Sequence, residues 1–201
     1  MNKILVAALA MAGLVSAGAV YADDSGLMVR ARAVNLNWDN GHKDGLPEAV
    51  KADSRWIPEV DVSYFFNKNL AAELVLTYPQ EVDIKSGSTK LGHVDALPPS
   101  LLLQYHFADL GAFNPYVGVG LNYTLFTKKS FNYGGSKYSV DQSTWGLAGQ
   151  IGFDYFLTKN VSLNVDVKYI KMETKVKVDG GPAGKLELSP ITAGVGVGYR
   201  F

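Results

Sequence analysis

Apolar and polar residues alternate along most of this chain. The alternation recurs in eight segments, and in each segment the apolar residues share one parity while small, polar or charged residues take the other. Successive side chains of a β-strand point to opposite faces, so the pattern predicts eight strands that each have one apolar and one polar face. The predicted strands cover residues 26–36, 57–66, 70–79, 99–107, 116–126, 144–157, 161–169 and 191–201.

The last segment, residues 191–201, has apolar or aromatic residues at its odd positions and Thr192, three glycines and Arg200 at its even positions. A transmembrane β-strand needs about 9–11 residues of such alternation. The segment resembles the closing strand of a Gram-negative outer-membrane barrel. That resemblance implies that Tyr199 and Phe201 form the signal read by the outer-membrane assembly machinery. The alternative is an edge strand of a soluble sheet.

The N-terminus has the features of a secretory signal peptide. Lys3 is followed by an apolar stretch over residues 4–15 and by small residues up to Ala22. We predict a signal peptide over residues 1–22 and a single barrel domain over residues 23–201. Cleavage near Ala19 and an uncleaved membrane anchor are the alternatives.

Composition narrows the function classes. Removal of 22 residues from 201 leaves 179, with 18 basic and 19 acidic side chains, which is not the balance of a nucleic-acid-binding protein. The chain has no cysteine, so disulfides and thiolate metal sites are excluded, and no metal or cofactor motif is present. No long apolar helix follows the signal. A membrane protein without such helices must be a closed barrel, because backbone amides in lipid need internal partners.

The connections between the segments are alternately short and long. Residues 67–69, 108–115 and 158–160 are turn-like, whereas residues 37–56, 80–98, 127–143 and 173–187 are longer and polar. This is the arrangement of periplasmic turns and extracellular loops in outer-membrane barrels. The sequence therefore predicts an all-β fold, an eight-stranded antiparallel transmembrane β-barrel with short periplasmic turns and long extracellular loops.

The inward-facing residues divide the predicted barrel interior into two halves. The periplasmic half receives charged residues, and unpaired charges in so narrow a space would be costly, so we expect a paired network. Its predicted members are Arg30, Arg32, Glu59, Asp61, Glu73, Asp154, Asp166, Lys168 and Arg200. The extracellular half receives apolar residues, which predicts a concave site for a small hydrophobic molecule or, alternatively, ordinary packing near the rim. Its predicted lining is Leu36, Ile57, Val75, Leu102, Phe126, Ile170 and Met172.

Prolines occur in or at the outer ends of several predicted strands, among them Pro58, Pro79, Pro98, Pro99 and Pro190. Proline donates no ladder hydrogen bond. These residues could weaken the wall and permit a sideways opening, or they could simply terminate the strands.

Three stretches resemble the OmpW family of Gram-negative outer-membrane proteins. They are LPPSLLLQYHF over residues 97–107, NPYVGVGLNYT over residues 114–124 and WGLAGQIGFDY over residues 145–155. The resemblance implies an apolar channel in the outer membrane that passes small hydrophobic molecules, with sideways exit into the membrane lipids, and an association with stress or osmotic responses. Trp145 matches the family's tryptophan, and with Pro79 and Pro190 it is a candidate lateral gate.

Two other classes of function compete with the channel. A structural or surface-recognition barrel would use its external loops to bind host, phage or toxin partners. An enzyme would need a nucleophile, a base and an orienting group within reach. His42 and His93 are predicted in loops, His106 lies near the periplasmic rim, and Ser88 and Asp95 are near His93 only in sequence. We therefore expect no enzymatic activity.

Overall fold

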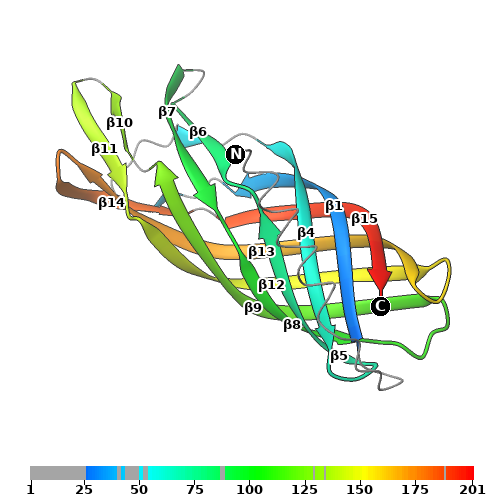
Figure 1. Cartoon of the computed structure of the whole chain (residues 1–201). Coiled ribbons are helices and arrows are strands. Elements are labelled where there is room, and N and C mark those ends of the chain that lie inside the picture. Colours follow the sequence, from blue (N-terminus) through cyan, green and yellow to red (C-terminus); the bar gives the residue numbers. More distant parts are fainter. Residues whose placement is uncertain are drawn as a thin grey trace, which may run out of the picture.

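The computed structural model describes residues 26–39, 42–43, 50–51, 54–86, 89–128, 130–133, 135–187 and 189–201, all of them strands and their connections (Figure 1). The predicted signal peptide, residues 1–22, lies outside the described residues. The strands are β1 (Gly26–Asp39), β2 (His42–Lys43), β3 (Val50–Lys51), β4 (Arg55–Phe65), β5 (Leu70–Thr77), β6 (Gln80–Ser86), β7 (Thr89–Leu97), β8 (Ser100–His106), β9 (Phe113–Lys128), β10 (Ser130–Tyr133), β11 (Ser136–Val140), β12 (Ser143–Phe156), β13 (Val161–Val178), β14 (Gly181–Glu187) and β15 (Ser189–Arg200).

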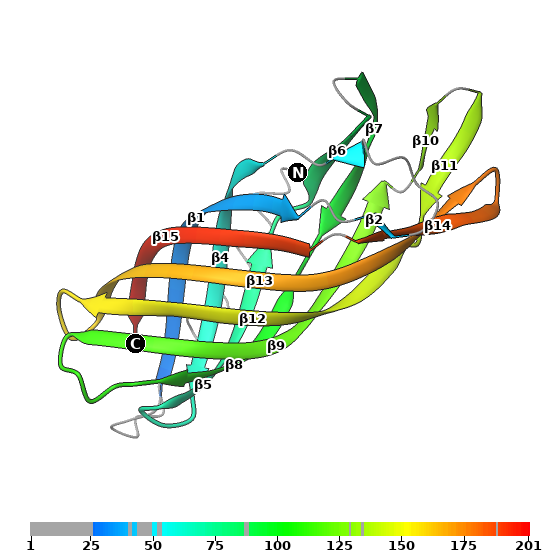
Figure 2. The same ribbon diagram turned by 180° about the vertical axis from the view of Figure 1, so that it is seen from behind.

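Eight of these strands close into an antiparallel barrel, in the order β1, β4, β5, β8, β9, β12, β13 and β15. Closure is made by the two ends of the chain, where β15 pairs with β1 from Met28↔Arg200 to Asp39↔Ser189 (Figure 2). The predicted fold class is therefore confirmed. Among the described residues, no helix has the length and apolar character needed to span a membrane.

The two ends of the barrel differ. At the short-turn end, Asn67 Oδ1 accepts hydrogen bonds from the backbone N–H groups of Asn69 and Leu70, both at 2.9 Å, which fixes a tight turn. At the opposite end, the hairpin end, the β6–β7, β10–β11 and β13–β14 hairpins extend the barrel (Figure 1). The sequence analysis predicted polar loops here, and for residues 173–187 this was wrong. The alternation of β13 continues to Val178, with Met172 and Val176 buried and Lys171, Lys175 and Lys177 exposed.

The barrel wall is apolar outside and largely polar inside. Outward residues such as Leu74, Val119 and Leu147 are exposed, as a lipid-facing surface requires. Near the short-turn end, exposed aromatic pairs lie edge to face with centroids about 5 Å apart, namely Tyr64–Phe66, Tyr105–Phe107 and Tyr199–Phe201. Such a belt matches the headgroup region of a bilayer.

Glycines make room for large side chains inside the barrel. A Cβ on Gly196 would lie 2.6 Å from Arg32 Cγ, and a Cβ on Gly120 would lie 2.6 Å from Leu102 Cα. Gly196 on β15 thus leaves room for the Arg32 side chain in the lumen, whereas Gly120 on β9 lets the backbone of the adjacent strand β8 approach closely.

Candidate functional site

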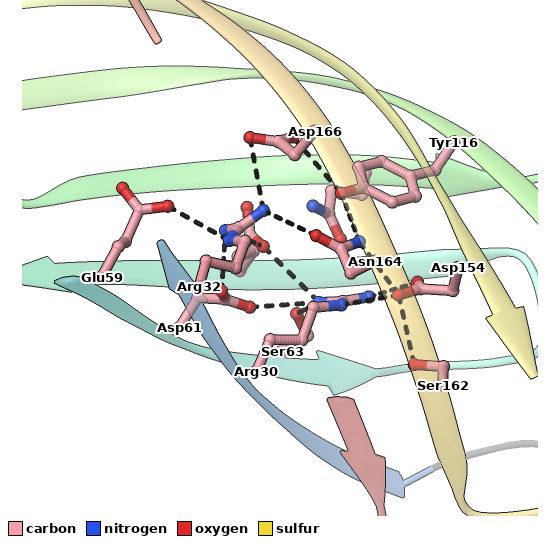
Figure 3. Close-up of polar contacts among 12 residues, drawn as sticks. Arg30, Arg32, Glu59, Asp61, Ser63, Tyr116, Asp154, Ser162, Asn164 and Asp166 are labelled. Atoms are coloured by element: carbon pink, nitrogen blue, oxygen red, sulfur yellow. Dashed lines mark hydrogen bonds and ion pairs between the residues drawn. The ribbon is translucent and has the colours of Figure 1, made fainter. Parts of the chain in front are cut away.

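A buried ion-pair network fills the lumen toward the short-turn end (Figure 3). Arg30 is fully buried and reaches across the barrel to Asp154, with Nη2 at 2.7 Å from Oδ2 and Nε at 3.0 Å from Oδ1. Its Nη1 donates to Asp61 Oδ1 at 3.2 Å and to Ser63 Oγ at 2.7 Å. This one guanidinium therefore ties β1 to β4 beside it and to β12 across the lumen.

Arg32 forms the second centre of the network. Its Nη2 lies 2.7 Å from Asp61 Oδ2 and 3.2 Å from Glu73 Oε1, and its Nε lies 3.1 Å from Glu59 Oε1. Lys168 Nζ, on β13, completes the upper edge at 3.3 Å from Glu59 Oε1. We call this set of buried charged residues the lumen network.

Neutral side chains that the sequence analysis did not assign to the network also join it. Tyr116 donates its hydroxyl to Asp166 Oδ2 at 3.3 Å, and Gln150 Nε2 donates to the same oxygen at 2.7 Å. Asn164 Nδ2 donates to Asp154 Oδ1 at 3.0 Å. Tyr116 was identifiable by its parity, because it precedes outward-facing Val117 on β9.

The lumen network contains all of the predicted charged residues except Arg200. The guanidinium of Arg200 lies at the short-turn end, over the ring of Phe65 at 4.2 Å. There Met28, Phe65 and Ala71 form a small buried apolar cluster. Below the network, the lumen thus holds these apolar side chains together with the Arg200 guanidinium and the buried His106 ring.

The lumen network is unbalanced in charge. Its cations are Arg30, Arg32 and Lys168, and its carboxylates are Glu59, Asp61, Glu73, Asp154 and Asp166. The packed side chains obstruct a straight path through the lumen.

An apolar pocket lies above the lumen network, toward the hairpin end. It encloses about 620 Å³ of space between atoms, including the part open to solvent at its mouth. Of the predicted lining, Leu36, Ile57, Val75, Phe126, Ile170 and Met172 line it, while Leu102 is buried in the same apolar cluster without lining the pocket. Lys168 and Glu59 form its charged floor. The sequence analysis missed Thr77, Gln80, Ala96, Pro98 and Ser100, which also line it.

The barrel wall is interrupted beside the apolar pocket. The ladder between β5 and β8 ends at Val75↔Ser100, and the ladder between β6 and β7 begins at Gln80↔Ala96. In this described part of the chain, no register pair joins residues 76–79 to residues 97–99. We call this gap the wall break.

Several backbone carbonyl groups at the wall break accept hydrogen bonds from nearby side chains. Pro79, Pro98 and Pro99 have no N–H group to satisfy. Asn122 Nδ2 donates to the carbonyl oxygens of Pro98 and Pro99 at 3.2 and 3.1 Å, and Gln80 Nε2 donates to the Tyr78 carbonyl oxygen at 2.8 Å. A break in a lipid-facing wall is tolerable under these conditions, because few backbone groups are left unpaired.

The three candidate gate residues lie in different places. Pro79 is within the wall break, and Pro190 lines the apolar pocket at the start of β15, where it pairs with Trp38. Trp145 faces outward at 66% exposure and packs against Tyr123 on the neighbouring strand, with ring centroids 4.6 Å apart. Because β12 remains paired with β9 there, Trp145 does not line the pocket or the wall break.

The described histidines lie far from one another in the fold. His106 is buried beneath the lumen network between Phe65 and Tyr116, with ring centroids 4.8 Å from each. His93 lies on the β6–β7 hairpin with Glu81 and Asp95, and their ligand atoms lie within 4.8 Å of one another. Such a trio could hold a metal ion, although exposed acidic groups commonly gather without one. Ser88 and the side chain of His42 lie outside the described residues.

Comparison with known proteins assigns the barrel to a family, because the OmpW family model matches residues 23–201. The chain belongs to the OmpW family. It is 30% identical to outer membrane protein W of Escherichia coli over 213 residues, covering 100% of both chains. It is 41% identical over 181 residues to an uncharacterized outer-membrane protein, y4mB, of Sinorhizobium fredii, covering 86% of this chain and 79% of y4mB.

A solved structure of similar fold is the outer membrane protein OprG of Pseudomonas aeruginosa. Its TM-score is 0.68 at 28% identity, with 89% of this chain and 97% of OprG covered. This OmpW-family chain is therefore an outer-membrane barrel of a Gram-negative bacterium. In such barrels the short turns are periplasmic and the long connections extracellular, so the apolar pocket opens toward the outside.

Proposed function

We propose that the protein takes up small hydrophobic molecules from outside the cell and releases them sideways into the outer membrane. The observation that carries the proposal is the position of the apolar pocket, which lies above the packed lumen network and beside the wall break. The family resemblance of the sequence points to the same class of solute. The partners are then hydrophobic solutes and membrane lipids, and no catalytic step is assigned to the protein.

The apolar walls favour the solute. Transfer of apolar surface from water stabilises a bound molecule by about 25 cal/mol for each Å² buried. Phe126, Ile170 and Met172 provide such surface on two strands, β9 and β13. A charged solute would lose its hydration there without full compensation.

The floor of the pocket argues against passage straight to the periplasm. Arg30, Arg32 and Tyr116 are buried and mutually cross-linked through carboxylates from several strands. Opening a path through them would separate charges in a low-dielectric space, which is costly. Sideways exit needs no such separation.

The wall break provides the sideways route. Thr77, Gln80, Ala96 and Pro98 line the pocket and also flank the break, so the pocket reaches the wall where the ladder is absent. A solute leaving here would meet exposed apolar residues such as Leu76 and Leu101 on the outer surface.

The test compares Phe126→Lys with Phe126→Leu in cells that display the protein at equal levels. Lysine places a charge in the pocket, whereas leucine keeps the pocket apolar. We expect Phe126→Lys to depress uptake of hydrophobic solutes at least about tenfold, since one uncompensated buried charge exceeds 1.4 kcal/mol. Phe126→Leu should retain most of the uptake. Uptake by a folded Phe126→Lys variant equal to that of the parent would contradict the proposal.

A further inference from the structure

Two polar atoms that line the apolar pocket have no hydrogen-bond partner in the protein. They are Gln80 Oε1 and Thr77 Oγ1, and both are buried. They lie on either side of Tyr78 and Pro79, at the wall break. Buried polar atoms are normally paired, so two orphaned atoms in one apolar pocket require a partner from outside the chain.

The orientation of the Gln80 amide is fixed by its other end. Gln80 is 2% exposed, and its Nε2 donates to the Tyr78 carbonyl oxygen at 2.8 Å. A carbonyl oxygen only accepts, so the amide nitrogen must face Tyr78, and the amide oxygen is the end of this pocket-lining side chain that is left without a partner. The group offered to a solute is therefore an acceptor, which needs a donor.

Other polar residues of the pocket already have partners. Thr192 Oγ1 donates to the Lys168 carbonyl oxygen at 3.4 Å, and Thr124 Oγ1 donates to Asn122 Oδ1 at 2.7 Å. Lys168 at the floor is paired with Glu59. Unmet hydrogen-bonding capacity is thus concentrated at Thr77 and Gln80.

We infer that the apolar pocket has a polar anchor, formed by Gln80 Oε1 and Thr77 Oγ1, which selects neutral amphiphiles carrying one hydroxyl group. The hydroxyl donates to Gln80 Oε1 and accepts from the Thr77 hydroxyl, while the apolar tail lies against Phe126, Ile170 and Met172. A carboxylate is disfavoured because it offers no donor to Gln80 Oε1. This inference deepens the proposed function and rests on it.

The test measures dissociation constants in lipid nanodiscs for two isomers, n-octanol and heptyl methyl ether. The isomers have the same atoms, but only the alcohol can donate a hydrogen bond. We expect the parent to bind the alcohol between about twofold and tenfold more tightly than the ether, the range of one buried neutral hydrogen bond. Gln80→Met should bring the ratio close to one, because it removes the acceptor that only the alcohol can use. Thr77→Val should weaken the binding of both isomers by a similar factor, because the oxygen of either isomer can accept from the Thr77 hydroxyl. Thr192→Val, which removes a hydroxyl from the same pocket that already has a partner, should leave the ratio unchanged.

Comparing ratios between variants cancels the partitioning of each isomer into lipid. Equal affinities of the parent for both isomers would overturn the inference, because the orphaned atoms would then hold only a water, and the proposed function would stand. An alcohol preference that persists in Gln80→Met, or affinities for both isomers that Thr77→Val leaves unchanged, would overturn it as well. Binding of neither isomer would overturn the inference together with the proposed function.

Discussion

Removal of Arg30 tests whether the lumen network holds the barrel together. In Arg30→Met, the carboxylates of Asp154 and Asp61 lose contacts of 2.7 and 3.2 Å to the same guanidinium. The remaining cations of the network are Arg32 and Lys168, against five buried carboxylates. Breaking a buried pair from one side costs about 3–5 kcal/mol, because the other charge stays buried without compensation.

The assay is urea unfolding of the reconstituted protein, read by the shift between compact and unfolded forms on unheated gels. The matched control is Lys68→Met, which removes the exposed pair of Lys68 Nζ with Asp109 Oδ1 at 2.8 Å. An exposed pair contributes about 0–1 kcal/mol, so this variant should unfold like the parent. The double variant Arg30→Met with Asp154→Asn should recover at least about 1 kcal/mol, because one uncompensated charge is neutralised.

Salt provides a second criterion for the same reasoning. Salt screens buried ion pairs only weakly. The decrease in the free energy of unfolding caused by Arg30→Met should therefore be similar at about 0.1 M and 1 M salt. A loss below about 1 kcal/mol, or a double variant no more stable than the single one, would refute the view that the network stabilises the barrel.

Three further predictions concern the wall, the wall break and assembly. Gly120→Val should destabilise the barrel by about 1–3 kcal/mol in urea unfolding, since its Cβ would lie 2.6 Å from Leu102 Cα, whereas Gly149→Val, with nothing within 4 Å, should be neutral. Asn122→Leu should cost about 1–3 kcal/mol in the same assay, because the Pro98 carbonyl oxygen loses the Asn122 donor, while the Pro99 carbonyl oxygen keeps the backbone N–H of Tyr123 at 3.0 Å; unchanged stability would show that the Pro98 carbonyl needs no such donor. Deletion of Phe201 should lower the amount of folded protein in the outer membrane on quantitative blots, and normal abundance would argue against the predicted assembly signal.

The barrel could be predicted from the sequence because each membrane strand has one face in the lumen and the other face toward lipid. Apolar and polar residues therefore alternate with a period of two. The same parity placed Arg30, Glu73 and Lys168 inside. Parity did not show that Arg200 lies over Phe65. The strands are tilted and staggered, so a residue's place in its strand does not give its height along the barrel axis. Tyr116 shares the parity of Gly118, but it was not assigned to the network, because the sequence analysis named only charged residues as its members.

The wall break was only partly predictable. Prolines at 79, 98 and 99 indicated weak pairing, but Gln80 appeared to belong to a polar loop. Its burial depends on the register Gln80↔Ala96, which turns the residue toward the lumen. Register between strands that follow a break is set by tertiary pairing, and alternation within one strand does not reveal it.

The path of the solute is tested most directly by photolabelling. Two apolar sites lie inside the barrel, Phe126 and Met172 in the pocket above the lumen network, and Met28 and Phe65 below it. A small alkyl diazirine supplied from outside and activated by light should label Phe126 and Met172, as read by peptide mass spectrometry, and should leave Met28 and Phe65 unlabelled. Equal labelling of both sites would indicate a straight channel to the periplasm, and the absence of label from Phe126 and Met172 would contradict the uptake of hydrophobic molecules through this pocket.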